Sequence, residues 1–229
     1  INAIRCAVHA TDSAIKVMHD HLEPGISEQR IWSYLHAENI ARGGEWIETR
    51  LLSSGPRCNP WYQECSGRII QNGELVGFDT DMIGTYGMCV DTSRTWLCGD
   101  KAPTAEQKKI YQMAYEQIQF NTELLKAGVT YKELTHQALQ YNPTEYNHYS
   151  FLYHGVGLCD EAPGIYFKEA WESYGYDGVI EPGMVMCVES YVGHKSGGSG
   201  VKLENQVLIT ENGPEVLTLY PFESRLLAI

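Results

Sequence analysis

The stretch Phe78-Asp79-Thr80-Asp81-Met82-Ile83-Gly84-Thr85-Tyr86-Gly87-Met88-Cys89-Val90-Asp91 places three acids in a segment that otherwise has the composition of a buried β-hairpin. Because strand side chains alternate between faces, we expect Asp79 and Asp81 to point the same way. A turn at residues 84–87 would bring Asp91 opposite them. Neighbouring carboxylates repel unless they are protonated or bridged by a cation, so the pattern predicts a cation site. The alternative is a solvated acidic pair at a strand end.

Three further candidates lie downstream in apolar stretches, where an unpaired charge would be costly: His154, Glu189 and Glu204. Taken singly, each could be a core polar group with a hydrogen-bond partner. Together with the three aspartates they make an oxygen-rich set with one imidazole, which is enough to hold one or two divalent first-row metals. These residue types suit iron, manganese, cobalt and zinc, and the residues alone do not choose among them.

The overall composition excludes several classes of protein. No run of the 229 residues approaches eighteen apolar positions, so we expect no membrane span. The net charge of −12 argues against a nucleic-acid or anionic-membrane partner and is compatible with a small zwitterionic ligand. Seven cysteines without CxxC pairs favour neither a disulfide framework nor a zinc finger, and we expect them to be reduced in a cytoplasmic protein. We expect Cys89, Cys159 and Cys187 to be small buried apolar groups.

Hydrophobic periodicity predicts helices over residues 4–22, 27–42 and 104–125, and another from residue 130. Strands are predicted at residues 46–52, 74–78, 92–97, 150–158, 184–192, 201–210 and 215–219. An internal echo links residues 22–27 (LEPGIS) with residues 125–130 (LKAGVT), since each is a helix end, a glycine, an aliphatic residue and a hydroxyl N-cap. The echo predicts duplicated α+β halves packed around a shared sheet, with ligands converging from both.

These features resemble the pita-bread metallopeptidase family of methionine aminopeptidase, prolidase and creatinase. The resemblance covers nearly the whole chain and rests on the echoed turns, the acidic hairpin, His154-Gly155-Val156-Gly157, Pro182-Gly183-Met184-Val185 before Glu189, and Val201-Lys202-Leu203-Glu204-Asn205. It implies an α+β pita-bread fold, with duplicated α/β halves around a curved, mostly antiparallel sheet. It implies that residues 1–229 are a single C-terminal catalytic domain and that a creatinase-like N-terminal domain is absent from this sequence. Its implied metal ligands are Asp79 or Asp81, with Asp91, His154, Glu189 and Glu204.

The chain departs from the peptidases of this family in ways that bear on function. Those peptidases carry a histidine in the loop before the hairpin, where this chain has Trp61, and another about seven positions after the ligand histidine, near Asp160. They usually have one aspartate eleven positions before the second, where this chain has Asp79 and Asp81 on either side of Thr80. Because the missing histidines would hydrogen-bond a scissile amide, amide hydrolysis is not expected.

This pattern resembles the dimethylsulfoniopropionate lyase branch of the family, which is found in marine bacteria. The resemblance implies an iron-bound homodimeric lyase that cleaves its small zwitterionic substrate to dimethyl sulfide and acrylate. Its implied metal set is Asp79, Asp81, Asp91, His154, Glu189 and Glu204.

The remaining roles concern the reaction itself. Asp160 lies six residues after His154 and is the candidate base, and its alternative role is a surface ion pair or a turn cap. Aromatic faces bind sulfonium cations, and the candidates are Trp61, Tyr149, Tyr153 and Tyr166. Two rival functions stay open: a metallohydrolase of the Xaa-Pro dipeptidase or aminopeptidase type, and a non-catalytic binding module of the same fold.

Overall fold

The computed structural model describes residues 1–61 and 63–227, and its helices follow the predicted pattern closely. The helices are α1 (Asn2–Asp20), α2 (Glu28–Ala41), α3 (Ala105–Leu124), α4 (Tyr131–Gln137) and α5 (Lys168–Tyr174), with 3-10 turns at Gly55–Cys58 and Thr85–Gly87. Ser27 caps α2, and Thr104 and Thr130 cap α3 and α4 with complete capping boxes. Four of the helices were predicted, and α5 was missed.

The strands of the described residues form three antiparallel sheets. One orders β2-β3-β6, a second orders β1-β4-β5, and the largest orders β12-β11-β10-β8-β9, with β7 also pairing β10. Their bounds are β1 (Trp46–Ile47), β2 (Leu52–Ser54), β3 (Leu75–Phe78), β4 (Met82–Ile83), β5 (Cys89–Val90), β6 (Arg94–Leu97), β7 (Tyr146–Asn147), β8 (Phe151–Gly155), β9 (Gly164–Tyr166), β10 (Val185–His194), β11 (Gly200–Thr210) and β12 (Gly213–Val216).

The prediction of one strand over residues 46–52 is wrong, because the chain leaves β1 after Ile47 and enters β2 only at Leu52. The strand predicted at 215–219 lies earlier, at Gly213–Val216. The other predicted strands are present.

The internal echo corresponds to a repeated hydrogen-bond pattern. Gly25 N donates to Ile70 O at 2.9 Å, and Gly128 N donates to Ile180 O at 2.8 Å. Both glycines have positive φ, +100° and +91°, a backbone conformation that glycine adopts at low cost. Each turn therefore ties the segment before a helix, α2 or α4, to the segment before a strand, β3 or β10, in the same way, which supports the predicted duplication.

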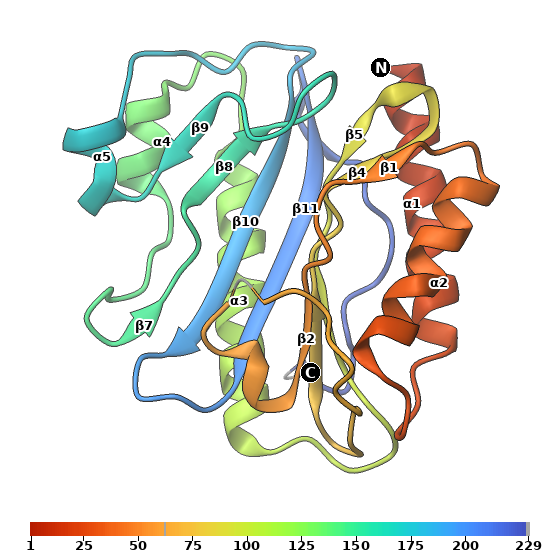
Figure 1. The fold of residues 1–229 in the computed structure, drawn as a ribbon. Coiled ribbons are helices and arrows are strands. Elements are labelled where there is room, and N and C mark those ends of the chain that lie inside the picture. The colour runs from red at the N-terminus through yellow and green to blue at the C-terminus, as the bar shows by residue number, and fades with distance from the viewer. Residues whose placement is uncertain (62, 228–229) are drawn as a thin grey trace.

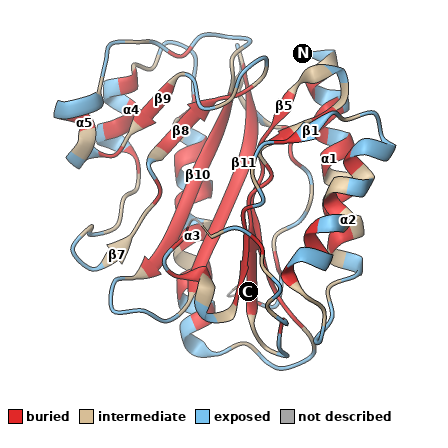
Figure 2. Ribbon diagram, in the orientation of Figure 1, coloured by how far each residue is buried: buried red, intermediate tan, exposed pale blue. Residues whose placement is uncertain are grey.

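Each half has its own apolar core. Figure 1 shows α1 and α2 stacked on one side of the molecule and α3 behind the long strands β10 and β11. The first core joins α1 and α2 to β2, β3 and β6, and the second joins α3 and α4 to β8, β10 and β11. The strands at the centre are buried along almost their whole length (Figure 2). This arrangement confirms the predicted α+β class.

The two halves meet where β6 lies against β11. Thr95 Oγ1 donates to Lys202 O at 2.8 Å and accepts from Lys202 N at 3.1 Å, and Glu204 N donates to Ser93 O at 3.1 Å. The acidic residues of the first half therefore face β11 of the second half. In the described part of the chain, no helix combines the length and the apolar character that crossing a membrane requires.

Candidate metal centre

The strand register of the largest sheet brings three predicted ligands, His154, Glu189 and Glu204, close together on neighbouring strands. Cys187 on β10 pairs with His154 on β8, and two residues further along β10, Glu189 lies directly opposite Glu204 on β11. Because side chains two apart on a strand share a face, these groups all project to the same side. Lys202, two residues before Glu204, projects there as well. The regular pleat of long strands is thus sufficient to gather this part of the site.

The three aspartates come together by a different route. The regular strand β3 ends at Phe78, and Asp81 has a φ of +37°, which is uncommon for a residue other than glycine. Ligand oxygens of Asp79, Asp81 and Asp91 nevertheless lie within 4.8 Å of one another. The predicted cluster is present, but simple strand alternation is the wrong reason for it, since a left-handed residue redirects the chain.

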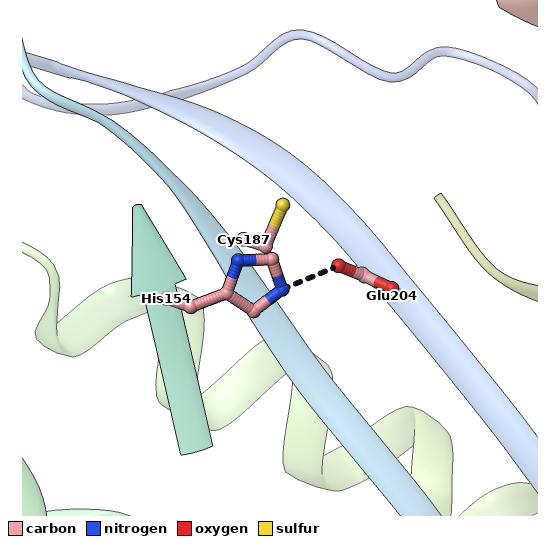
Figure 3. Close-up of side chains that lie close together, drawn as sticks. All are labelled: His154, Cys187 and Glu204. Atoms are coloured by element: carbon pink, nitrogen blue, oxygen red, sulfur yellow. Dashed lines mark ion pairs between the residues drawn. The ribbon is translucent and has the colours of Figure 1, made fainter. Parts of the chain in front are cut away.

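A second group contains Asp91, His154, Glu189 and Glu204, again with ligand atoms within 4.8 Å of one another. Nε2 of His154 lies 3.0 Å from Glu189 Oε1, 3.3 Å from Glu204 Oε1 and 3.7 Å from Asp91 Oδ2. Figure 3 shows the imidazole directed at Glu204. Asp91 belongs to both groups, so the six predicted ligands form one continuous cluster made of two overlapping groups.

Cys187 lies beside this second group, with its sulfur close to His154 and Glu204 (Figure 3). It is fully buried, as expected, and Cys89 is also buried. The expectation for Cys159 is wrong, because that residue is exposed in the loop after β8.

Burial and mutual repulsion act on the carboxylates of the cluster. Burial, the larger cause, and neighbouring acids raise the pKa of Asp91 well above its usual value and that of Asp81 to about 8. Burial also raises the pKa of Asp79, against the opposing effect of Lys202. Burial alone would lower the pKa of His154, but its hydrogen bonds to the two glutamates raise that pKa well above the usual value.

Five carboxylates surrounded by apolar strands need more positive charge than one imidazole and one ammonium can supply. Oxygen-rich sites with one histidine suit divalent first-row metals. The described residues therefore fit a centre of one or two divalent ions, which would replace the protons that the raised pKa values indicate.

Sequence reasoning missed Lys202 as a functional residue. It is fully buried, and its Nζ lies 2.8 Å from Asp79 Oδ2 and 2.9 Å from Glu204 Oε2. A detectable signal was present, because a lysine two positions before a buried acid on an apolar strand must share that acid's face.

Thr49 is a second residue that the sequence analysis missed. Its hydroxyl donates a short hydrogen bond to Asp81 Oδ2, and both side chains line a cleft of about 520 Å³. Thr49 lies in the irregular segment between β1 and β2, so no periodic pattern points to it.

Asp160, the predicted base, lines the same cleft. Its Oδ1 is 3.5 Å from His154 Nδ1 and accepts a hydrogen bond from Glu161 N at 2.9 Å. Burial, opposed by His154, raises the pKa of Asp160 to about 7. Asp160 therefore makes a contact within its own loop, which its alternative role predicts, and it also lies beside the predicted ligand His154. A carboxyl with this pKa can exchange protons near neutrality.

Two of the four predicted aromatic residues lie together beside the centre. Trp61 and Tyr149 share one buried cluster, and Lys202 Nζ lies 4.6 Å from the centre of the Tyr149 ring. The Tyr149 hydroxyl donates to Glu161 at 3.3 Å, which connects this cluster to the cleft.

The other two aromatic predictions need correction. Tyr153 is on the opposite face of β8 from His154, where it packs in the core and donates to Asn121 O of α3 at 3.1 Å. Strand alternation explains this, since residues 153 and 154 must point to opposite faces. Tyr166 packs 5.0 Å from Phe151 and 5.6 Å from Tyr174, ring centre to ring centre, rather than in the cleft.

The chain is similar in sequence to two curated lyases. It is 51% identical to "Dimethylsulfoniopropionate lyase DddP" of Roseovarius nubinhibens, over 99% of this chain and 52% of that protein. It is 45% identical to the protein of the same name from Roseobacter denitrificans, over 100% of this chain and 53% of that protein. The chain thus spans about half the length of these relatives.

Among solved structures, the prolidase of Pyrococcus horikoshii is similar in fold. Its TM-score is 0.83 and its identity 28%, over 97% of this chain and 62% of that one. This similarity confirms the predicted pita-bread fold. The profile of metallopeptidase family M24 matches residues 2–211, which is nearly the entire chain, with all six predicted ligands inside it. The chain belongs to metallopeptidase family M24.

Proposed function

We propose that the protein containing this chain is a metal-dependent lyase that cleaves dimethylsulfoniopropionate to dimethyl sulfide and acrylate. The observation that carries the proposal is the position of Asp160, which faces the cleft with a pKa of about 7 and lies 3.5 Å from the buried His154. Support also comes from the two relatives named as lyases of this substrate.

The reaction is a base-initiated β-elimination. The carboxylate of Asp160 takes the proton from the carbon next to the substrate carboxylate, and the electron pair of that C–H bond becomes the new C=C bond. The bond between the β-carbon and sulfur then breaks, and its electron pair leaves with sulfur as neutral dimethyl sulfide. A bound divalent ion would neutralise the charge that develops on the substrate carboxylate. Asp160 returns its proton to water before the next turnover.

The residues proposed to hold that ion are Asp79, Asp81, Asp91, His154, Glu189 and Glu204. We propose iron as the ion, with one or two equivalents, and a homodimer as the working form, because the chain is similar to the lyase branch of the family. Elemental analysis of protein purified without added metal tests the ion, and size-exclusion chromatography with light scattering tests the dimer. Cytoplasmic location and the lack of a nucleic-acid partner stay predictions from the sequence.

Trp61 and Tyr149 are proposed to face the sulfonium group. This group needs no hydrogen-bond donor, and aromatic rings attract cations through their faces. Trp61 and Tyr149 share one buried cluster, and Lys202 Nζ, which contacts three of the proposed ligands, lies 4.6 Å from the centre of the Tyr149 ring, so the two rings are close to the proposed metal centre.

The test is gas-phase detection of dimethyl sulfide from the wild-type protein and Asp160→Asn, both at full encoded length. Asn keeps the shape of the side chain but removes its basicity, so turnover should fall by about 10²–10⁴ while metal content stays unchanged. Absence of sulfide from the wild type would remove the lyase proposal. Equal rates from both proteins would leave the lyase intact and exclude Asp160 as the base.

An Xaa-Pro dipeptidase is the second candidate, because the fold is shared with a prolidase. Release of proline from an Xaa-Pro dipeptide by the same preparation would favour it over the lyase.

A further inference from the structure

Lys202 has surroundings unlike those of an ordinary buried lysine. Its Nζ contacts three carboxylates, at 2.8 Å from Asp79 Oδ2, 2.6 Å from Glu189 Oε2 and 2.9 Å from Glu204 Oε2, and it donates to Ser93 Oγ at 2.8 Å. All these side chains are essentially buried. One carboxylate would suffice to pair a buried ammonium, and here three proposed metal ligands surround it.

The two glutamates divide their oxygens between two positive groups. Oε1 of Glu189 and Oε1 of Glu204 face His154 Nε2, at 3.0 and 3.3 Å, while Oε2 of each faces Lys202 Nζ. The oxygens of Asp79 are divided between a neutral hydroxyl and the ammonium, because Oδ1 accepts from Ser93 Oγ at 2.6 Å and Oδ2 faces Lys202. Half of the oxygens of these three ligands are therefore engaged by the ammonium.

The net charge of the cluster shows how Lys202 affects metal binding. When ionised, the five carboxylates of the proposed ligand set carry five negative charges, and two divalent ions with one ammonium would balance them. In the absence of metal, the ammonium contacts three of these carboxylates. Lys202 thus lowers the repulsion between the carboxylates, and it also repels an incoming cation.

We propose that Lys202 is an internal cation that competes with metal ions for Asp79, Glu189 and Glu204. It stabilises the folded protein before metal binds, and it weakens metal binding by holding oxygens that the ion needs. This inference rests on the metal centre of the proposed function, but not on the identity of the substrate.

The test compares wild type with Lys202→Met and Lys202→Arg, at full encoded length and stripped of metal. Met is close to lysine in length and carries no charge, and Arg keeps the charge. Mn²⁺ is the probe, and its binding is followed by the electron paramagnetic resonance signal of the free ion. Thermal unfolding without metal is recorded alongside.

Lys202→Met should unfold at a lower temperature than wild type without metal, and it should bind Mn²⁺ at least about tenfold more tightly, because one positive charge near the ion is gone. Lys202→Arg should stay within a few-fold of wild type in affinity. A lysine with a purely structural role would lower stability without tightening metal binding. Equal or weaker Mn²⁺ binding by Lys202→Met would therefore overturn the proposal.

A second comparison keeps the test decisive if Lys202→Met does not fold. Asp79→Asn removes one carboxylate, so the double variant Asp79→Asn/Lys202→Met has the same net charge as wild type. It should bind Mn²⁺ more tightly than Asp79→Asn alone, and equal affinity would contradict the competition. If wild type binds no Mn²⁺, Fe²⁺, Co²⁺ or Zn²⁺, the metal centre and this inference fall together. If it binds metal but releases no dimethyl sulfide, the lyase proposal alone falls.

Discussion

The two halves of the molecule repeat one local design but deliver their ligands differently. The second half presents His154, Glu189 and Glu204 from continuous strands, two of which run for ten and eleven residues. The first half presents its aspartates around strands of two to four residues, with a left-handed backbone at Asp81. Regular strands hold ligands through the sheet itself, whereas the irregular segment needs added support, which Thr49 supplies for Asp81.

The largest effect on metal binding is expected from removing Asp91, the ligand that both groups share. Asp91→Ala should lose both metal equivalents and all measurable turnover, because Asp91 belongs to each group of ligand atoms. His154→Ala and Asp81→Ala should each weaken one equivalent by about 100-fold or more, a larger effect than the 10–100-fold of a supporting residue. Elemental analysis and Mn²⁺ titration measure this. Identical losses in all three variants would show that the two groups are not separate centres.

The hydrogen bond from Thr49 to Asp81 in the first half can be tested by substitution of Thr49. Thr49→Val keeps the shape but removes the hydroxyl that donates to Asp81, so metal affinity should fall by about 10–100-fold. Thr49→Ser retains the hydroxyl and serves as the matched control, with affinity close to wild type. Mn²⁺ titration of the three proteins is the measurement. If valine and serine behave alike, Asp81 needs no such support.

The pH dependence of the metal-free protein follows from Asp81. Its pKa is raised from 3.8 to about 8 in the folded state by burial and by Asp79, so between these values the folded protein holds a proton that the unfolded chain has lost. The stability this proton provides is complete below pH 4 and is lost as the pH rises through about 8. We expect the unfolding temperature of metal-free protein to fall between pH 5 and pH 8 for this reason.

Asp81→Asn is the control for this pH effect, because its amide does not titrate, and the fall should be smaller. Saturating Mn²⁺ should also reduce the fall in wild type, since a bound ion replaces the proton. A flat profile in metal-free wild type would show that Asp81 is ionised without metal.

The smallest effects should come from the repeated turns. Gly25→Ala and Gly128→Ala each place a side chain at positive φ with no atom within 4 Å of the added carbon, so only backbone strain is introduced. Each should lower the free energy of unfolding by about 1–2 kcal/mol, and by similar amounts if the turns are equivalent. Urea denaturation measures this, with Gly67→Ala as a control at a glycine that is equally open and has no positive φ. A large difference between the two variants in the loss of unfolding free energy would show that the two turns share a backbone conformation but do not contribute equally to stability.

Several features of this fold follow from hydrophobic periodicity and local chemistry, and these can be predicted from the amino-acid sequence. The hydroxyl caps, the glycine turns and the apolar faces predicted four helices and the long strands, because each is a local consequence of backbone geometry. The apolar stretches around Glu189 and Glu204 likewise predicted that both side chains are buried. Strand alternation, applied to β8 and β11, would also have excluded Tyr153 and included Lys202.

The groups that meet where β6 lies against β11 are set by the packing of the two halves against each other. The contact of Lys202 with Asp79 spans 123 residues, and the hydrogen bond from Thr49 to Asp81 joins two irregular segments. Neither contact can be predicted from the periodicity of the sequence. The contact between Lys202 and Asp79 depends on how the two halves pack, and the contact between Thr49 and Asp81 depends on the left-handed backbone at Asp81. The residue types of the centre can therefore be read from the chain, whereas the balance of charge within it is set by long-range packing.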